Sequence, residues 1–147
     1  MRHYHIYLIE DDVAETFFGE ESKLFHLFME TVSSESVFHR NTLQKQIDYI
    51  TKPIPVFAIE KELRNAFRHR RDYSQHAGWH LIEIPGTGSR AQLKIGESRM
   101  EMESTGCVAA ETTFFEVLRQ SERCLLAVEF NEHRCGWLKP VKQTNII

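Results

Sequence analysis

Histidine is the residue type of this chain with the clearest potential to hold a metal ion, because eight histidines stand among 147 residues. His3 and His5 alternate onto one face of a predicted strand, and His76 and His80 have the i, i+4 spacing of many paired ligands. Neither pair has a clear third ligand nearby, and Gly78 weakens any helix between the second pair. We therefore expect surface histidines, with a metal site as the less favoured alternative.

Nucleophilic catalysis has little support in the sequence. The chain has no GxSxG motif, and Cys135, two residues from His133, has no third group beside it to orient the pair. The segment GTGSRA at 86–91 has glycines like those of a phosphate-binding loop, but a predicted strand follows it where a helix would have to begin. We interpret the segment as a hairpin turn and expect no enzyme, no catalytic residue and no cofactor.

One cluster of basic residues suggests a different function. Arg64 and residues 68–71, RHRR, lie beside Phe67 and Tyr73, and Arg with Tyr can contact phosphates and stack on bases. Binding of nucleic acid through the region from Arg64 to Arg71 is therefore an alternative function. A helix that ends with the cations its dipole favours explains the same residues. Because the net charge is −3, we expect no direct binding to DNA.

Length and composition predict one folded domain over residues 1–147. Hydrophobic residues make up 41% and charged residues 27%, which is typical of globular chains. Three cysteines without a CxxC spacing indicate reduced thiols. The chain has no signal-peptide pattern and no run of the about 20 apolar residues that a membrane-spanning helix needs. We expect a cytoplasmic protein that does not insert into membranes.

The elements that must position any site begin with a strand and two helices. The β-branched and aromatic run at 3–9 predicts a strand. Apolar residues at helical spacing predict a helix over 11–32 with Phe18 and Val32 on its buried side, which Gly19 bends or interrupts. A second helix, capped at Asn41 or Thr42, runs to about 51.

In the rest of the chain the period of the apolar residues changes twice. A short strand over 56–59 and a third helix that ends at RHRR come first, and hairpin strands follow from 79 to about 102. A helix over 109–121 and a buried strand over 125–130 come next, and GWLKPV at 136–141 closes the domain, with Pro140 at an edge or in a loop. The predicted fold is α+β: a mixed, mostly antiparallel sheet of about five to six strands with about four helices, in which the N-terminal strand precedes a helical hairpin.

The first two helices carry more apolar surface than one core contact needs. The apolar arc of the first helix spans about 180°, against the about 100° of an ordinary core-facing stripe. If the two helices pack as a hairpin, Val13 and Phe17 meet Gln46 and Tyr49 in one exposed patch with an acidic rim. Aromatic anchors inside a polar rim are typical of protein interfaces, although Phe17 and Tyr49 as plain core residues explain the pattern equally well.

Four segments carry a resemblance to a known family. They are YLIEDDVAETFFGEES (7–22), KQIDYITKPIP (45–55), AETTFFEVL (110–118) and AVEFNEHRCGWLKPVKQ (127–143). In residues and in spacing they resemble the sporulation inhibitor of replication (SirA) family of endospore-forming bacteria. The likeness covers nearly the whole chain and is weakest at 33–41 and 85–106.

This resemblance implies a non-enzymatic inhibitor of replication. Proteins of the family bind the N-terminal domain (domain I) of the replication initiator DnaA and restrain initiation as a cell commits to sporulation. The family's contact surface maps onto Val13, Phe17, Gln46 and Tyr49 of this sequence. Val13 stands where the family pattern has a larger aromatic residue, so this position buries less area. Phe17 stands where the pattern has Tyr, so this position lacks the hydroxyl group.

Overall fold

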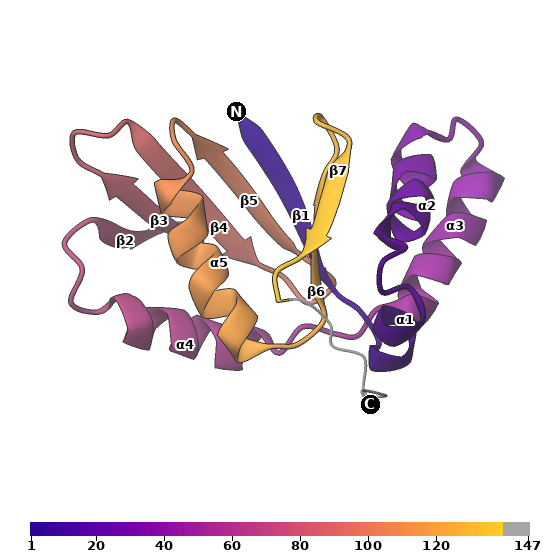
Figure 1. Cartoon of the computed structure of the whole chain (residues 1–147), viewed down its shortest axis with the longest axis horizontal. Coiled ribbons are helices and arrows are strands. Elements are labelled where there is room, and N and C mark those ends of the chain that lie inside the picture. The colour runs from indigo at the N-terminus through magenta and orange to yellow at the C-terminus, as the bar shows by residue number, and fades with distance from the viewer. Residues whose placement is uncertain (140–147) are drawn as a thin grey trace.

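The computed structural model describes residues 1–139, and Figure 1 shows how its helices and strands are arranged. Within these residues the chain forms seven strands and five helices. In chain order they are β1 (Arg2–Leu8), α1 (Asp11–Thr16), α2 (Glu21–Ser33), α3 (Val37–Ile50), α4 (Val56–Phe67), β2 (Tyr73–His76), β3 (Trp79–Ile84), β4 (Ser89–Ile95), β5 (Met100–Thr105), α5 (Ala109–Ser121), β6 (Leu125–Glu129) and β7 (Arg134–Trp137). The predicted α+β class is confirmed, with slightly more strands and helices than expected.

All the strands belong to one sheet in the order β2-β3-β4-β5-β1-β6-β7, and every pairing between the described strands is antiparallel. β1 lies between β5 and β6, where Tyr4 is opposite Met102 on one side and Glu129 on the other. This inner position explains why the N-terminal strand is apolar and aromatic.

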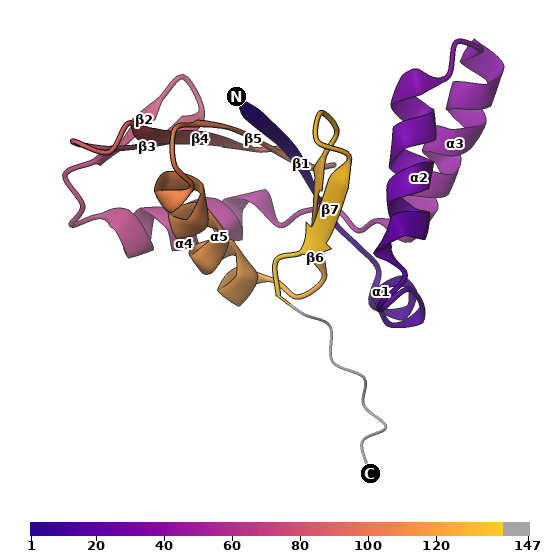
Figure 2. The same ribbon diagram turned by 45° about the horizontal axis from the view of Figure 1, so that its top comes forward.

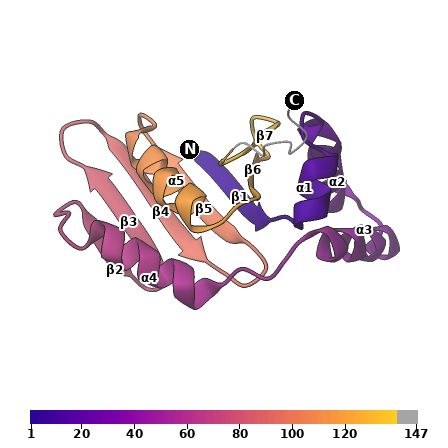
Figure 3. The same ribbon diagram turned by 60° about the horizontal axis from the view of Figure 1, so that its bottom comes forward.

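Two helices cover one face of the sheet. Figure 3 shows α4 and α5 in front of it. Helical spacing turns Ile59 and Leu63 of α4, and Phe114 and Leu118 of α5, inward, where each is at most 1% exposed. They pack on the β1 face that carries Tyr4, Ile6 and Leu8 and form the larger of two apolar clusters.

The α2–α3 hairpin packs on the opposite face, at the β1–β6–β7 side of the sheet (Figure 2). Successive strand residues point to opposite faces, so Tyr7 belongs to a second cluster while its neighbours Ile6 and Leu8 belong to the first. The ring of Tyr7 stacks on Phe28 of α2 with centroids 4.3 Å apart, and Phe28 is 1% exposed. The hairpin is therefore anchored to β1 through aromatic packing.

Two expectations about the first helix meet different outcomes. The helix is interrupted after Thr16, and Gly19 in the break has a φ of +82°, so the predicted interruption is confirmed. Phe18 and Val32 are 38% and 58% exposed, so the prediction that they lie on the buried side is wrong. The break takes Phe18 out of the helical register, and Val32 lies on a turn of α2 that borders a cavity instead of the sheet.

Two further boundaries differ from the prediction. α3 begins at Val37, and its cap is Ser36 instead of Asn41 or Thr42, at least five residues earlier than expected. The Ser36 hydroxyl oxygen accepts a hydrogen bond from the His39 backbone N–H at 3.3 Å and caps the helix. The stretch 56–59 is the first turn of α4 and not a strand, with Pro55 at the position just before the helix. The predicted edge at Pro140 lies outside the described residues.

Candidate partner-binding surface

The outward face of α3 exposes an aromatic side chain. Leu43 and Ile47 turn inward, each 5% exposed. Tyr49 follows Ile47 by two residues, about 200° around the helix, and is therefore on the far side. Its side chain is 83% exposed, and Gln46, three residues before it, is exposed as well. Of the two alternatives that the sequence left open for Tyr49, an exposed patch or the core, the structure shows exposure.

A shallow groove of about 450 Å³ runs beside Tyr49 between α2 and α3. It is lined by Leu27, Thr42, Lys45, Gln46, Tyr49 and Ile50. Leu27 and Ile50 supply half-buried apolar surface, while Thr42, Lys45 and Gln46 supply polar edges. An apolar floor with polar edges is the arrangement that protein interfaces favour.

Val13 and Phe17 lie in and directly after α1. The backbone N–H of Phe17 donates to the Val13 carbonyl at 3.0 Å, so the two side chains are one helical turn apart. Both are half-buried and pack against the hairpin cluster that includes Ile47. The neighbouring Asp12 and Glu15 are exposed, which gives this end of the surface an acidic border.

Backbone contacts hold the start of α1 against the end of α3. The N–H of Glu10 donates to the Ile50 carbonyl at 2.8 Å, and Ile9 forms an isolated antiparallel bridge with Thr51. A hydrogen bond of 3.3 Å from the Lys52 ammonium to Asp11 lowers the pKa of that carboxyl group. The four predicted contact residues thus lie on two helices that share one junction and one apolar cluster. That all four touch one partner is still a prediction.

Exposed apolar side chains concentrate in the part of the chain that forms α1, α2 and α3. Of the eight large hydrophobic residues exposed within residues 1–139, five lie between positions 18 and 49. They are Phe18, Val32, Val37, Phe38 and Tyr49. Phe38 is 83% exposed and lies eleven residues before Tyr49, about 20° away on the helix. Sequence reasoning missed Phe38 because it began the helix after that residue.

The basic cluster near the end of α4 has its aromatic residues engaged elsewhere. Phe67 is 3% exposed, and the Tyr73 ring lies 5.1 Å from it in the core. The Tyr73 hydroxyl is 2.7 Å from Nδ1 of His80, which leaves neither ring free to stack on a base. Arg70 pairs with Asp72 at 2.8 Å, which neutralises part of the positive charge.

The histidine, cysteine and glycine-loop candidates for chemistry lie in surroundings that give them structural roles. The expectation of a surface histidine is wrong for His80, which is buried. Its Nε2 lies 2.6 Å from Glu60 and its Nδ1 lies next to Tyr73, so His80 joins β3 to α4 and β2. Burial, with Glu21 as a smaller cause, raises the pKa of the Cys135 thiol, the opposite of activation. No three His, Cys, Asp or Glu side chains within residues 1–139 form a group suited to a metal ion. The segment 86–91 lies at the turn between β3 and β4 and runs into β4, as predicted.

The fold and surface describe an α+β protein whose best candidate site is an exposed face on helices beside the sheet. The family model described as sporulation inhibitor of replication protein SirA matches residues 2–142. A relative of that name from Bacillus subtilis (strain 168) is 39% identical over 148 residues, which covers 99% of each chain. The chain belongs to the SirA family.

Across residues 1–139, none of the helices combines the length and apolar composition of a bilayer-spanning segment.

Proposed function

We propose that this protein inhibits the initiation of DNA replication during sporulation by binding the N-terminal domain of the initiator DnaA. Membership of the SirA family and the name of the 39% identical relative support the inhibitory function. The 83% exposure of Tyr49 beside an apolar groove is the observation that carries the site. An aromatic residue left in water on a helix face is the kind of anchor that partner binding buries.

The proposed surface combines fully exposed side chains with half-buried ones. Tyr49 and Gln46 project from α3 and supply an anchor and an amide group, whereas Val13 and Phe17 present the exposed portions of half-buried side chains. A transient regulatory interface of this kind buries on the order of 1,200 Å². A few anchors then hold most of the binding free energy, with Tyr49 first among them.

Steric exclusion is the mechanism that we propose. An inhibitor that covers a helical face of the DnaA N-terminal domain excludes other proteins from that face or hinders productive assembly at the origin. Inhibition by steric exclusion needs no catalytic group and no cofactor. It takes place in the cytoplasm, where the initiator acts. The acidic border near Val13 favours a partner surface that carries positive charge at the matching place.

The nucleic-acid alternative has weaker support. Its two aromatic residues, Phe67 and Tyr73, are used in packing and in a hydrogen bond to His80. A nucleic-acid site would then depend on Arg64, Arg68 and Arg71 alone, which provide charge without stacking.

Calorimetric titration of the full chain into the purified N-terminal domain of DnaA tests the proposal. We expect saturable binding with a dissociation constant in the micromolar range or below. A parallel gel-shift experiment with duplex and single-stranded DNA should show no salt-sensitive complex. No heat of binding at micromolar concentrations would contradict the assignment of the partner, and a salt-sensitive shift would favour the basic cluster.

A further inference from the structure

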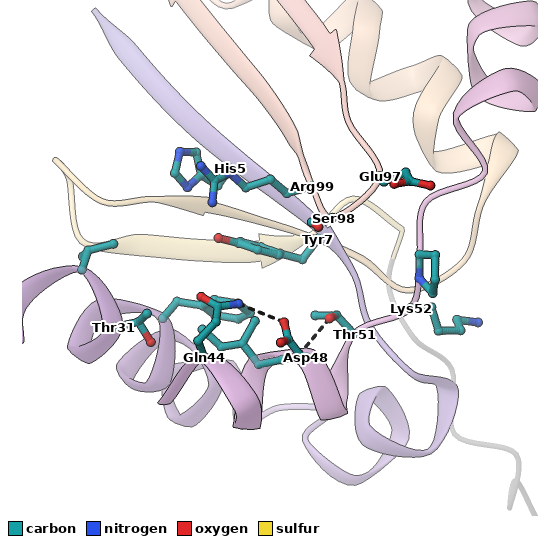
Figure 4. A pocket seen from close by; sticks show the side chains of 14 residues that line it. His5, Tyr7, Thr31, Gln44, Asp48, Thr51, Lys52, Glu97, Ser98 and Arg99 are labelled. Atoms are coloured by element: carbon teal, nitrogen blue, oxygen red, sulfur yellow. Dashed lines mark hydrogen bonds between the residues drawn. The ribbon is translucent and has the colours of Figure 1, made fainter. Parts of the chain in front are cut away.

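A cavity of about 330 Å³ lies in the corner where the α2–α3 hairpin meets the sheet (Figure 4). β1 contributes His5 and Tyr7, the turn between β4 and β5 contributes residues 97–99, and the hairpin with the linker after it contributes the remaining wall. The volume is at the small end of the roughly 300–1,000 Å³ of ligand pockets. A small ligand, not a drug-sized one, fits this space.

Part of the cavity is apolar. Phe28 of α2 and Ile47 of α3 line it and are 1% and 5% exposed. The stacked ring of Tyr7 adjoins them and ends in a hydroxyl group. An aliphatic side chain placed here would exchange contact with water for contact with apolar atoms.

Opposite charges stand on the two sides of this cavity. Arg99 belongs to the sheet side and Asp48 to α3, and Figure 4 shows them on facing walls. Glu97 and Lys52 also line the cavity, at the end away from His5, and Lys52 pairs with Asp11 at 3.3 Å. Asp48 accepts a hydrogen bond from the Gln44 amide at 2.9 Å, and Arg99 forms a partly exposed ion pair with Glu101 through one N–H at 3.2 Å. A carboxylate offers about four acceptor positions and a guanidinium five N–H donors. Both groups therefore have capacity for a ligand.

His5 lines the same wall of the cavity as Arg99. Its Nδ1 is shielded from solvent and has no hydrogen-bond partner among residues 1–139. Burial, helped by the nearby Arg99, lowers the pKa of His5 to about 4, so the imidazole is neutral at neutral pH. The neutral ring therefore leaves Arg99 as the positive charge of this wall.

We infer that this cavity binds a small zwitterion of the α-amino-acid type. The ligand carboxylate pairs with Arg99, its ammonium group pairs with Asp48, and its aliphatic side chain lies toward Phe28 and Ile47. Two charges of opposite sign on facing walls select a ligand that carries both, because either charge alone leaves one wall without its partner.

The inference is independent of the proposed interface. Asp48 lies about 100° from Ile47 on one flank of α3, and Gln46 lies about 100° away on the other flank. Tyr49 is on the outward side, away from the cavity. A ligand can therefore occupy the cavity whether or not DnaA binds to the outer face.

A titration followed by two-dimensional amide NMR tests the inference on the full chain without any partner. The probes are glycine, L-leucine, isocaproate, which lacks the amino group of leucine, and isoamylamine, which lacks its carboxylate. We expect saturable shifts from L-leucine at millimolar concentrations, centred on residues 44–51 and 97–99. Each compound with a single charge should bind at least about tenfold more weakly.

Charge-removing variants identify the groups. Asp48→Asn and Arg99→Gln should each weaken L-leucine binding by about tenfold or more, and both side chains are exposed enough that folding should be kept. Glu62→Gln, an exposed acid on α4 outside the cavity, is the matched control and should change nothing. The inference is overturned if no amino acid gives saturable shifts, or if isocaproate or isoamylamine binds as tightly as L-leucine.

Discussion

The backbone N–H of Glu10 donates a hydrogen bond of 2.8 Å to the carbonyl oxygen of Ile50. This bond joins the start of α1 to the last residue of α3, across forty positions of the chain. α1 has only six residues, too few to persist as an isolated helix in water, so the junction and the packing of Val13 must hold it in place. The relative position of Val13 and Tyr49, and hence the geometry of the proposed interface, depends on this junction.

The break between α1 and α2 predicts a backbone effect at Gly19. Its φ is +82°, while a Cβ built there would meet nothing within 4 Å. Gly19→Ala should therefore lower the free energy of unfolding by about 1 kcal/mol through backbone strain alone. Gly136→Ala is the control, because that position also has free space and an ordinary φ. Urea denaturation should give a change within about 0.5 kcal/mol for the control, and equal losses at both positions would refute the strain argument.

Two equally exposed aromatic residues give a matched test of the proposed interface. Tyr49 on α3 is 83% exposed, and Phe57 on α4 is 79% exposed. Tyr49→Ala should weaken binding to the DnaA N-terminal domain by more than about 1 kcal/mol, because an anchor is lost. Phe57→Ala should leave the affinity unchanged within error. Calorimetry measures both affinities, and an equal effect of the two substitutions would remove Tyr49 from the interface.

Phe17 requires a different design because it also contributes to the core. Its side chain is half-buried against the hairpin cluster, so truncation costs folding free energy as well as binding free energy. Phe17→Tyr keeps the ring and restores the hydroxyl of the family pattern. If position 17 faces the partner, this variant should bind at least as tightly as the natural chain, with its unfolding midpoint unchanged. A clear loss of affinity would contradict a partner contact that accepts the hydroxyl group at this position.

The carboxylate of Glu111 predicts a large effect on stability. Glu111 is 3% exposed and accepts hydrogen bonds from the hydroxyl groups of Tyr4 and Ser104 and from the Arg2 guanidinium. Burial and the adjacent Glu111 raise the pKa of Tyr4 to about 12. Glu111→Ala leaves these donors without an acceptor and should cost about 2–4 kcal/mol of unfolding free energy.

An exposed acid on the same helix is the control for Glu111. Glu116 forms a 3.5 Å pair with Arg119 on the surface of α5, and such pairs contribute at most about 1 kcal/mol. Denaturant titration should separate Glu111→Ala from Glu116→Ala by about 2 kcal/mol or more. Similar losses would mean that the hydrogen bonds of Glu111 add nothing beyond a surface pair.

Local patterns predicted the elements whose signals are complete within one segment. The helix over 109–121 has the bounds expected, because Ala110, Phe114 and Leu118 recur at helical spacing inside it. The prediction of a strand over 56–59 was wrong because a run of four apolar residues fits a strand and a helix turn equally well. The polar edge strand Tyr73–His76 was missed since it pairs with β3 alone and has no apolar face to detect.

The candidate sites divide in the same way. The phase of Tyr49 relative to Leu43 and Ile47 is local information; it allowed an exposed position, which the structure shows, but did not exclude the core. The cavity between Asp48 and Arg99 was not predicted, because those residues are fifty-one positions apart and meet only when the hairpin packs on the sheet. The junction between Glu10 and Ile50 is made by backbone atoms, so the residue types at these positions do not predict it.

The histidine at position 5 predicts how stability depends on pH. Burial, followed by the nearby Arg99 and His3, lowers its pKa in the folded protein from 6.5 to about 4. Between these two values the unfolded chain binds a proton that the folded chain does not, so the free energy of unfolding falls as the pH drops from 6.5 toward 4. The ring is partly exposed, and solvent screening limits this contribution to about 1–2 kcal/mol. Urea denaturation of the natural chain, His5→Gln and His26→Gln at pH values on both sides of this window measures it. His5→Gln should flatten the fall by about 1–2 kcal/mol, while His26→Gln, at an exposed position on α2, should leave it unchanged. A fall of the same size in all three proteins would assign the pH dependence to groups other than His5.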